Sequence, residues 1–509
     1  MFCDRTELSR RALLAGAFAS LAVPAMASAP TRSPRPPARP APGHIAALSG
    51  EPAALVAPSG SLSSLIERAN LSGETAMVAL DAETGAVIEE HRADLRMPPA
   101  STAKAVTTLY ALQTLGAEYR FITRVESRGG AIANGTLSGD LVLRGGGDPT
   151  LQTAELARLA DELIERGLRR IDGRFLVDDS ALPDVHQIDN GQPVPAGYNP
   201  AIGGLNLNFN RVYFGWEVAN GRAALSMDAR SNTEVPGVSM IDIEAVARSM
   251  PVYTHDVRGE REHWTVAANA LGTPGSRWLP VRRPGAYAGD VFRALLAARG
   301  CQLPEPRRAT VAPGQVLAEH RSDPLTSILR EMLRYSTNIT AECVGMTASQ
   351  RLGPGVQALA PSASRMNGWI RERYGAAGLG LLDHSGLSEG SRIAPRTMAQ
   401  YLLAARREGV LPGLLREHPL RDANGREIAS HPVEVRAKTG TLNFVSALAG
   451  YAQLRGGRAV VFSIVSADLP RRAALSDDTR ERPVGARSWS GRARALQQDV
   501  IERWSAMHS

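Results

Sequence analysis

Cysteine is scarce in this chain of 509 residues, which holds only Cys3, Cys301 and Cys343. No cysteine or histidine pair has the spacing of a metal site, so the sequence predicts no metal, and it implies no cofactor. Cys301 and Cys343 could form a disulfide in an oxidising compartment, or they could stay as two free, buried thiols. The sequence leaves both alternatives open.

Long apolar runs are also missing. After the N-terminal segment no stretch is apolar enough to span a bilayer, which excludes a stable membrane span there. At the N-terminus, Arg10 and Arg11 precede a short apolar run, and small residues suited to a signal peptidase follow it. This order predicts a signal peptide over residues 1–27 and an exported, periplasmic protein. The paired arginines favour the twin-arginine route, with the Sec route as the alternative.

Charge of one sign does not dominate the chain. Lysine and arginine number 58 against 51 aspartates and glutamates, which gives a net charge of +7. The basic residues are scattered and not clustered with aromatic ones, so no nucleic-acid partner is predicted. A hydrophobic fraction of 43% allows a sizeable core, and the length suggests two or three domains. Nothing in the sequence indicates the oligomeric state.

The chain divides into a proline-rich segment, two similar ends and a different middle. Residues 28–43 are too rich in proline for a helix or a sheet and predict an extended linker. Apolar runs over 77–88 predict a hairpin, residues 101–115 predict a helix, and three runs over 435–466 predict strands. Dense turn signals mark the middle. This pattern predicts one α/β domain interrupted by another.

The first motif with chemical content is Ser101-Thr102-Ala103-Lys104, at the start of the predicted helix. Residues three apart on a helix share one face, so the Ser101 hydroxyl and the Lys104 amine are neighbours. A serine needs a nearby base to become a nucleophile, and a lysine whose pKa is lowered by burial or by a second cation can be that base. Alone the pattern is weak, because it arises by chance in many helices.

The second motif is Ser336-Thr337-Asn338, between two predicted helices. Ser336 could relay a proton, and Asn338 could orient an amide group. The alternative is an ordinary helix cap, because serine, threonine and asparagine are the preferred N-cap residues.

The third motif, Lys438-Thr439-Gly440-Thr441, lies in a predicted strand. A strand edge can pair with a peptide substrate, and Gly440 would let that substrate approach closely. Lys438 and the hydroxyls of Thr439 and Thr441 could hold a carboxylate. The alternative is an edge strand with a glycine kink and ordinary polar residues.

The order of the three motifs is more specific than any one of them. S-x-x-K, then S-x-N, then K-T-G is the signature of penicillin-binding proteins and serine β-lactamases. The long separation of Ser101 and Ser336 resembles the class C low-molecular-mass penicillin-binding proteins of the DacB type. Residues 147–151 (Gly-Asp-Pro-Thr-Leu) and 385–388 (Ser-Gly-Leu-Ser) also match that family.

The resemblance implies an α/β (α+β) fold, in which a transpeptidase-like, β-lactamase-like domain is interrupted by a large inserted domain with a nested, mostly β subdomain. It implies that residues 44–122 and 325–509 form the two parts of the transpeptidase-like domain. Residues 123–324 would then form the insertion.

The resemblance also implies the activity. A serine-type D-Ala-D-Ala carboxypeptidase/endopeptidase acts on peptidoglycan stem peptides through an acyl-enzyme, and β-lactam antibiotics inhibit it covalently. Ser101 would be the nucleophile, Lys104 its base, and Ser336 the relay that passes a proton to the leaving amine. Backbone N–H groups of Ser101 and Thr441 would form the oxyanion hole. The residues that would bind the substrate are Asn338, Lys438, Thr439, Gly440 and Thr441.

Two features depart from the family pattern. The family's Asp-Gly-Ser-Gly-Leu-Ser, followed by a basic residue, reads here with His384 in place of the first glycine and Glu389 in place of the basic residue. The tryptophan-rich stretch that often lines the pocket for the substrate's side chain has no match around residues 187–198. We therefore expect the catalytic motifs to be kept and the recognition of the stem peptide to differ.

Two other functions fit the same scaffold. A β-lactamase or esterase would need a group that activates water for deacylation, and no glutamate is placed like the class A base. A non-catalytic cell-wall-binding protein would have no need of Ser101 and Lys104. Penicillin distinguishes the three, because a peptidase keeps a long-lived adduct, a β-lactamase turns it over and a binding protein forms none.

Overall fold

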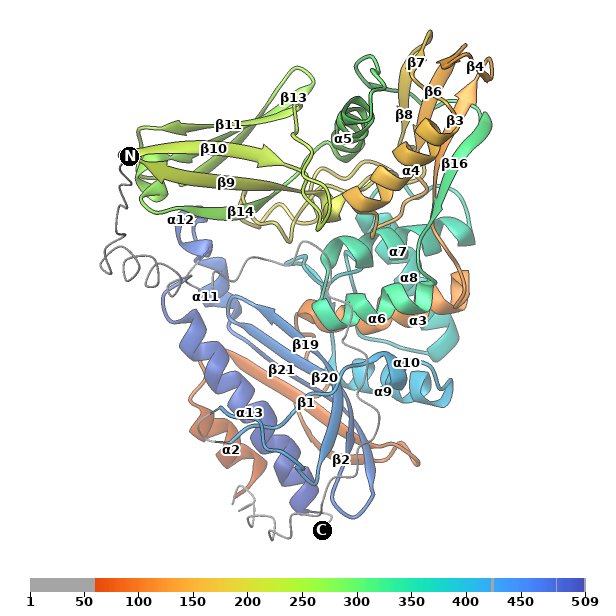
Figure 1. Cartoon of the computed structure of the whole chain (residues 1–509). Helices are drawn as coiled ribbons and strands as arrows, with labels where there is room; N and C mark the ends of the chain where they lie inside the picture. Colours follow the sequence, from red (N-terminus) through yellow and green to blue (C-terminus); the bar gives the residue numbers. More distant parts are fainter. Residues whose placement is uncertain (1–59, 423–424, 482, 508–509) are drawn as a thin grey trace, which may run out of the picture. The chain divides into compact units, whose positions relative to one another are not determined.

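The computed structural model describes residues 60–422, 425–481 and 483–507 (Figure 1). The predicted signal peptide and linker, and Cys3, lie outside the described residues. In the described part of the chain, no helix combines the length and the apolar character needed to cross a membrane. The expected mixed α/β fold is observed, with 33% helix and 28% strand.

A five-stranded antiparallel sheet joins the two ends of the described chain. Its strands are β1 (Glu74–Asp81), β2 (Val87–His91), β19 (Glu434–Leu442), β20 (Val445–Gln453) and β21 (Ala459–Ala467). The order is β19-β20-β21-β1-β2, so the predicted N-terminal hairpin adds to the three predicted C-terminal strands. The central strands are buried at nearly every position because both faces of the sheet are covered.

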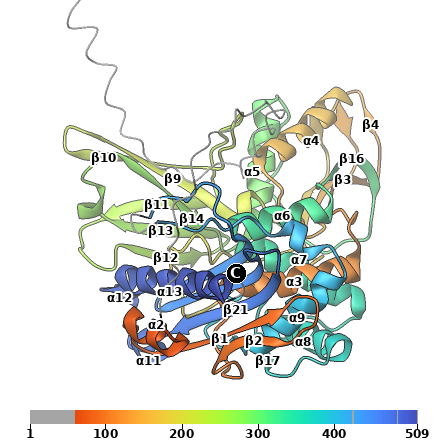
Figure 2. The same cartoon turned by 90° about the horizontal axis from the view of Figure 1, so that it is seen from below.

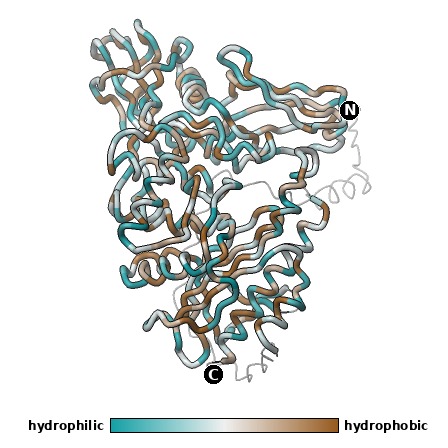
Figure 3. The backbone as a smooth tube through the Cα atoms, turned by 180° about the vertical axis from the view of Figure 1, so that it is seen from behind, coloured by the Kyte–Doolittle hydropathy of each residue, from teal (hydrophilic) through white to brown (hydrophobic). Residues whose placement is uncertain are grey.

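Helices cover both faces of this sheet (Figure 1, Figure 2). The helices of this part are α2 (Leu62–Ala69), α3 (Ala103–Leu115), α6 (Leu325–Tyr335), α7 (Asn338–Leu352), α8 (Leu359–Tyr374), α9 (Pro395–Arg407), α10 (Leu411–Leu414), α11 (Leu469–Ala473), α12 (Asp477–Arg480) and α13 (Ala486–Ala506). On one face, Leu65 of α2 and Trp504 of α13 pack with Phe462. On the other face, α9 and the helices around α3 form a larger core. Figure 3 shows hydrophobic residues concentrated along these strands.

The middle of the chain builds a second five-stranded sheet. Its strands are β3 (Ile122–Arg128), β6 (Asp140–Arg144), β8 (Phe175–Asp178), β15 (Arg307–Arg308) and β16 (Gln315–Arg321). They run in the order β15-β8-β6-β3-β16, and α4 (Thr153–Glu165) and α5 (Pro284–Ala298) pack in the same core. Antiparallel pairing of β16 with β3 places Arg321 opposite Ile122, so the two ends of this region lie side by side.

Two three-stranded sheets follow within the middle region. Their strands are β9 (Arg211–Ala219), β10 (Arg222–Asp228), β11 (Ile241–Val246), β12 (Tyr253–Arg258), β13 (Arg261–Ala267) and β14 (Gly275–Pro280). Their orders are β10-β9-β14 and β11-β13-β12. Among the described residues, no strand of the middle region pairs with the first sheet. The short elements of the chain are β4 (Ile132–Ala133), β5 (Thr136–Leu137), β7 (Arg170–Ile171), β17 (Leu379–Gly380), β18 (Arg392–Ile393), η2 (Asn208–Asn210) and η3 (Ala268–Leu271).

The two cysteines of the described chain, Cys301 and Cys343, are both free and buried. Of the two alternatives that the sequence left open, the structure therefore has the pair of buried thiols.

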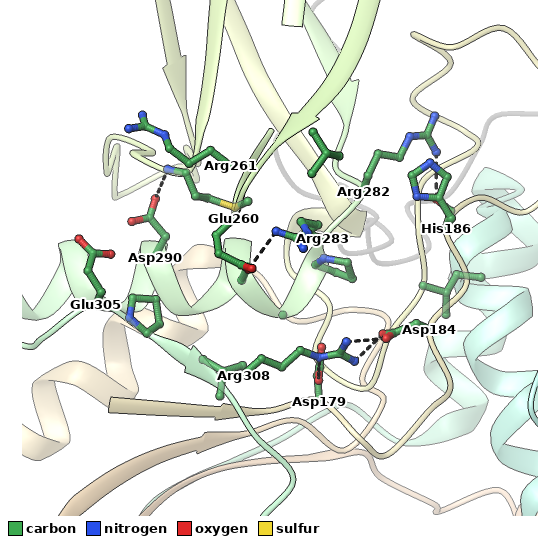
Figure 4. A pocket seen from close by; sticks show the side chains of 18 of the residues that line it. Asp179, Asp184, His186, Glu260, Arg261, Arg282, Arg283, Asp290, Glu305 and Arg308 are labelled. Carbon is green, nitrogen blue, oxygen red and sulfur yellow. Dashed lines mark hydrogen bonds and ion pairs between the residues drawn. The ribbon is translucent and has the colours of Figure 1, made fainter. Parts of the chain in front are cut away.

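A cavity of about 670 Å³ lies in the middle region, beside β8 and the start of α5 (Figure 4). Several of its charged side chains pair with each other. Arg308 lies 2.6 Å from Asp179 and 2.5 Å from Asp184, and Arg283 lies 2.9 Å from Glu260. None of the predicted site residues lines this cavity, so the active site is sought elsewhere.

Candidate active site

Ser101 lies in a short 3-10 turn, η1 (Ala100–Thr102), directly before α3. Two glycines press against this turn. A Cβ atom on Gly440 would lie 3.0 Å from the backbone nitrogen of Ser101, and one on Gly386 would lie 1.9 Å from the carbonyl oxygen of Ala100. Ala100 has a φ of 45°, a costly conformation that the surrounding contacts maintain. Gly440 is predicted to let the substrate approach closely, and in the structure it also makes room for the turn that carries Ser101.

Lys104 lies one turn further along α3, as its spacing from Ser101 predicts. Its side chain is fully buried, and its Nζ is 2.9 Å from Ser101 Oγ, 2.7 Å from Asn338 Oδ1 and 2.9 Å from the carbonyl oxygen of Ser385. The amide and carbonyl oxygens can only accept hydrogen bonds. A neutral amine that donates its two N–H groups to them has its lone pair directed at the Ser101 hydroxyl. This is the orientation that a general base requires.

The environment of Lys104 favours the neutral amine. Burial lowers the pKa of Lys104 from 10.5 to about 8, while the carboxyl groups of Glu342 and Asp383 act in the opposite direction. Of the two causes that the sequence suggested, burial or a second cation, burial is the one that lowers this pKa. A pKa near 8 leaves a useful fraction of the amine unprotonated near neutral pH.

Ser336 and Asn338 lie on either side of the joint between α6 and α7. Ser336 ends α6 in a left-handed conformation with a φ of 60°, and Asn338 begins α7. The amide of Asn338 accepts from Lys104 through Oδ1 and donates through Nδ2 to the carbonyl of Tyr198 at 2.9 Å. Thr337, the N-cap residue of α7, makes no side-chain cap. The side chains of Ser336 and Asn338 each contact a lysine, so the simple helix-cap alternative does not describe them.

Lys438 is buried on β19, next to Ser336. Its Nζ donates to Ser336 Oγ at 2.9 Å and to the carbonyl oxygen of Thr439 at 2.7 Å. Burial, followed by the positive charges of Lys104 and Arg416, lowers the pKa of Lys438 well below its usual 10.5. An ammonium group that is so poorly stabilised can pass a proton to the neighbouring hydroxyl at low cost.

The outer edge of β19 opens onto the site. Residues 416–418 cover its first half, where Ala437 N–H donates to Arg416 and His418 N–H donates to Val435. Alternate residues of a strand turn their backbone groups to the same edge, so Thr439 and Thr441 turn theirs to this side as well. At Thr441 the edge reaches a cavity of about 600 Å³ that Ser101 also lines.

The structure gathers all eight predicted site residues around the start of α3, but not all of them line this cavity. Four of them line it: Ser101, Ser336, Asn338 and Thr441. The other four, Lys104, Lys438, Thr439 and Gly440, are not among its lining residues. Among the described residues, no group of three or more His, Cys, Asp or Glu side chains could hold a metal ion.

A loop from the middle region completes the cavity, and the sequence did not predict its contacts. Tyr198 lines the cavity from this loop. Asp189 of the loop accepts from the backbone N–H of Glu389 at 3.0 Å, and the carbonyl of Gly191 accepts from Arg480 at 2.5 Å. In the sequence, residues 187–198 are distinguished only by the absence of the family's tryptophan-rich stretch. No local pattern marks their contacts, since the partners lie 200 and 289 positions away.

Positive charge is in excess along one wall of the cavity. Arg472, Arg480 and Arg487 line it, together with Glu481. Glu389, which stands where the family has a basic residue, accepts from Arg472 at 3.0 Å and from Arg480 at 2.6 Å. The acidic residue is thus held by two arginines. Nothing in the local sequence marked these arginines, which come from three C-terminal helices, the short α11 and α12 and the long α13.

The motifs, their geometry and the interrupted sheet define a penicillin-recognising serine hydrolase, and comparison with known proteins gives the family. Residues 59–483 match the model of the D-Ala-D-Ala carboxypeptidase 3 (S13) family, so the chain belongs to that family of serine peptidases. The family expected from the order of the motifs, and the serine-type carboxypeptidase function that goes with it, are confirmed.

Relatives agree along most of the chain. A D-alanyl-D-alanine carboxypeptidase of Actinomadura sp. (strain R39) is 27% identical over 441 residues, which is 80% of this chain and 80% of the relative. The carboxypeptidase DacB of Haemophilus influenzae is 26% identical over 436 residues, which is 79% of this chain and 87% of the relative. The crystal structure of penicillin binding protein 4 (dacB) from Haemophilus influenzae has the same fold, with a TM-score of 0.69, 22% identity, and coverage of 87% of this chain and 100% of that one.

Proposed function

We propose that this enzyme cleaves D-Ala-D-Ala-terminated peptidoglycan stem peptides through an acyl-enzyme on Ser101. The observation that carries the proposal is the contact between Lys104 and Ser101, at 2.9 Å between Nζ and Oγ. The other acceptors around Lys104 direct its lone pair at that hydroxyl. A serine held in this way by a buried amine is an activated nucleophile and needs no metal or cofactor.

The acylation step uses the groups around Ser101. Lys104 takes the proton of the Ser101 hydroxyl while Oγ attacks the carbonyl carbon of the penultimate D-Ala. Backbone N–H groups of Ser101 and Thr441 stabilise the oxyanion, in line with the outward edge of β19 beside the nucleophile. Asn338 holds the amide of the incoming peptide.

The leaving group needs a proton, and Ser336 is suited to deliver it. Its hydroxyl lies 2.9 Å from Lys438, whose lowered pKa favours proton release. Ser336 passes this proton to the departing amine of the terminal D-Ala. Water then hydrolyses the acyl-enzyme and regenerates Ser101.

The charge of the cavity suits a substrate with a free carboxylate. We assign binding of the terminal carboxylate to the K-T-G strand, through Lys438, Thr439, Gly440 and Thr441. Of the two threonines, Thr441 is the better supported, because it lines the cavity and Thr439 does not. The excess of arginine on the cavity wall attracts acidic stem peptides further.

The domain division and the location follow from the same proposal. We assign residues 44–122 and 325–509 to the transpeptidase-like domain and residues 123–324 to the insertion. The pairing of Ile122 with Arg321 supports this division, because an insertion whose ends lie side by side leaves its host sheet intact. A peptidoglycan substrate lies outside the cytoplasm, so we propose export through the predicted twin-arginine signal to the periplasm.

The test combines two substrates. The wild-type enzyme should release D-Ala from a stem pentapeptide and should keep a penicillin adduct for many turnover times of the peptide. Rapid hydrolysis of penicillin without release of D-Ala would mean a β-lactamase instead. Binding of peptidoglycan without either reaction would mean a wall-binding protein. A β-lactam complex is known for the Haemophilus influenzae protein of the same fold, which makes penicillin the natural probe.

A further inference from the structure

A buried carboxylate lies behind the catalytic lysine and takes no part in the steps above. Glu342 is on α7, four residues after Asn338, so both side chains leave the same face of the helix. The Glu342 side chain has no exposed surface. A carboxyl group in such a place is costly unless its oxygens are hydrogen-bonded, so its partners show what it is there to hold.

Both oxygens of Glu342 accept hydrogen bonds from the backbone of one turn. Oε2 accepts from His384 N–H at 2.9 Å, and Oε1 accepts from Ser385 N–H at 2.8 Å. The carbonyl oxygen of the same Ser385 accepts from Lys104 at 2.9 Å. Glu342 therefore holds the backbone segment that in turn holds Lys104.

A second buried carboxylate fixes the other end of this turn. Asp383 accepts from the backbone N–H of Gly386 at 3.1 Å and from that of Ser388 at 2.7 Å. The Ser391 hydroxyl adds a bond at 3.0 Å. The turn is thus tied down on both sides of Ser385, and its carbonyl has one position relative to Lys104.

The position of that carbonyl decides what Lys104 presents to Ser101. With Asn338 and Ser385 both accepting, the two N–H groups of the neutral amine are used, and only the lone pair is left for the serine. If the Ser385 carbonyl moved away, the amine could rotate and offer an N–H to Ser101. An N–H cannot take the hydroxyl proton, so the base would be lost in that orientation.

We propose that Glu342 is a positioning residue for the base: it fixes the Ser385 carbonyl against Lys104 and so keeps the lone pair of Lys104 directed at Ser101. This inference rests on the proposed function, in which Lys104 takes the serine proton. Glu342 itself touches neither the substrate nor the reacting atoms.

Because Glu342 lies close to Lys104, its effect should also be visible in the pH dependence of acylation. Burial raises the pKa of Glu342, while its hydrogen bonds from the turn and the nearby Lys104 favour the carboxylate. Replacing the carboxyl by an amide removes an anion that favours the ammonium form, which lowers the pKa of Lys104. The other ionisable groups around this pair come from the same turn, from α7 and from β19: Asp383, His384, Cys343 and Lys438.

Two substitutions separate position from charge. Glu342→Gln keeps the shape and removes the charge, and its NH2 group faces a backbone N–H that has lost its acceptor. Acylation by a fluorescent penicillin should slow by about ten- to a hundredfold, in keeping with a small misplacement of a reacting group. The rising limb of its pH profile, which reports the pKa of Lys104, should move to a pH about one unit lower. Glu342→Asp keeps the charge but is too short to hold both N–H groups, so its rate should fall while the limb stays in place.

A matched control removes a different buried hydrogen bond from the same turn. Ser362 Oγ lies 2.7 Å from Nε2 of His384, and Ser362→Ala leaves the Ser385 carbonyl and Glu342 untouched. Its acylation rate and pH profile should stay within about twofold of wild type, because Ser362 bonds neither Glu342 nor the Ser385 carbonyl and so acts independently of them. An unchanged rate and limb in Glu342→Gln would overturn the proposal. So would a loss of rate with no shift of the limb in both Glu342 variants, since that is the mark of a purely structural role.

A measurement on the unaltered protein covers the case in which the variants do not fold. The chain has two lysines, Lys104 and Lys438, so lysine labelled with ¹⁵N gives two side-chain signals. The Lys104 signal should titrate in two steps, because a group coupled to a nearby carboxyl shares its titration. A single step would overturn the proposal. Failure of the proposed function is seen separately, as wild-type enzyme that penicillin does not label on Ser101.

Discussion

Lysine is rare in this chain, and both copies, Lys104 and Lys438, lie in the site, while arginine supplies all the other basic side chains. The chemistry explains why these two positions need lysine. A guanidinium keeps its proton under all ordinary conditions, whereas an ammonium loses its proton readily when it is buried. The two lysines are buried beside the two serines of the motifs, at 2.9 Å in each case. Each therefore pairs a titratable amine with a hydroxyl, as proton transfer requires.

The pH dependence of acylation follows from the state of Lys104. Its pKa is lowered from 10.5 to about 8, and only the neutral amine can take the serine proton. Below about pH 8 the acylation rate should therefore rise roughly tenfold per pH unit, and above it the rate should level off. Stopped-flow acylation with a fluorescent penicillin from pH 5.5 to 9.5 measures this. A rate that falls across this range would rule out Lys104 as the base.

The same shift has a consequence for stability. Between about pH 8 and 10.5 the unfolded chain holds a proton on this lysine that the folded protein has already lost. The free energy of unfolding should accordingly gain from Lys104 as pH rises through that window.

At the scale of the elements, the close contact of β19 with the turn η1 positions the nucleophile. A Cβ on Gly440 would lie 2.8 Å from the carbonyl oxygen of Pro99, which is backbone and cannot rotate away. Gly440→Ala should push the strand from the turn and slow acylation by about ten- to a hundredfold, because displacements below 1 Å at reacting groups have such effects. Gly491→Ala is the control, since a Cβ there meets nothing within 4 Å. Equal rates for the two variants would contradict the account of β19.

Helix α13 contributes charge to the mouth of the cavity. Arg487 is exposed and lines it, and Arg494 of the same helix is exposed and does not. Arg487→Gln should raise KM for an acidic stem peptide about threefold and leave kcat unchanged, because a charge at the rim mainly affects encounter and weak binding. Arg494→Gln should change neither constant. The effect should fade in high salt, which screens exposed charges. A fall in kcat without a change in KM would give Arg487 a different role.

At the scale of the whole molecule, the sequence predicts what is local and repeated. The hairpin, the helix at Ser101 and the three last strands follow from apolar periodicity, and the motif order predicts that α3, β19 and the α6–α7 joint meet. The contacts that join distant segments could not be predicted in this way. Two such contacts are those of Tyr198 with Asn338 and of Arg480 with Gly191. Each joins positions more than 100 residues apart, and no local sequence pattern predicts either contact. Glu342 is an intermediate case, since its spacing from Asn338 places it on the right face but does not show what it holds.

The histidine at position 384 illustrates why a substitution can be read only in the fold. Beside the motif it looks like a catalytic candidate or an ordinary turn residue. In the structure it is buried, and it fits because the facing residue is Gly345, where a Cβ would lie 2.2 Å from the ring. Burial lowers the pKa of His384 to about 3, so it remains neutral.

The central claim is that Ser101 and Lys104 act as one unit, and penicillin labelling followed by peptide mapping by mass spectrometry tests it most directly. Wild-type enzyme should gain one penicillin, on the peptide that contains Ser101. Ser101→Ala should gain none, Lys104→Ala should acylate about a thousandfold more slowly, and the double variant should be no worse than Ser101→Ala alone, because residues in one proton path are not additive. An adduct on another residue, or normal labelling of Ser101→Ala, would contradict the account.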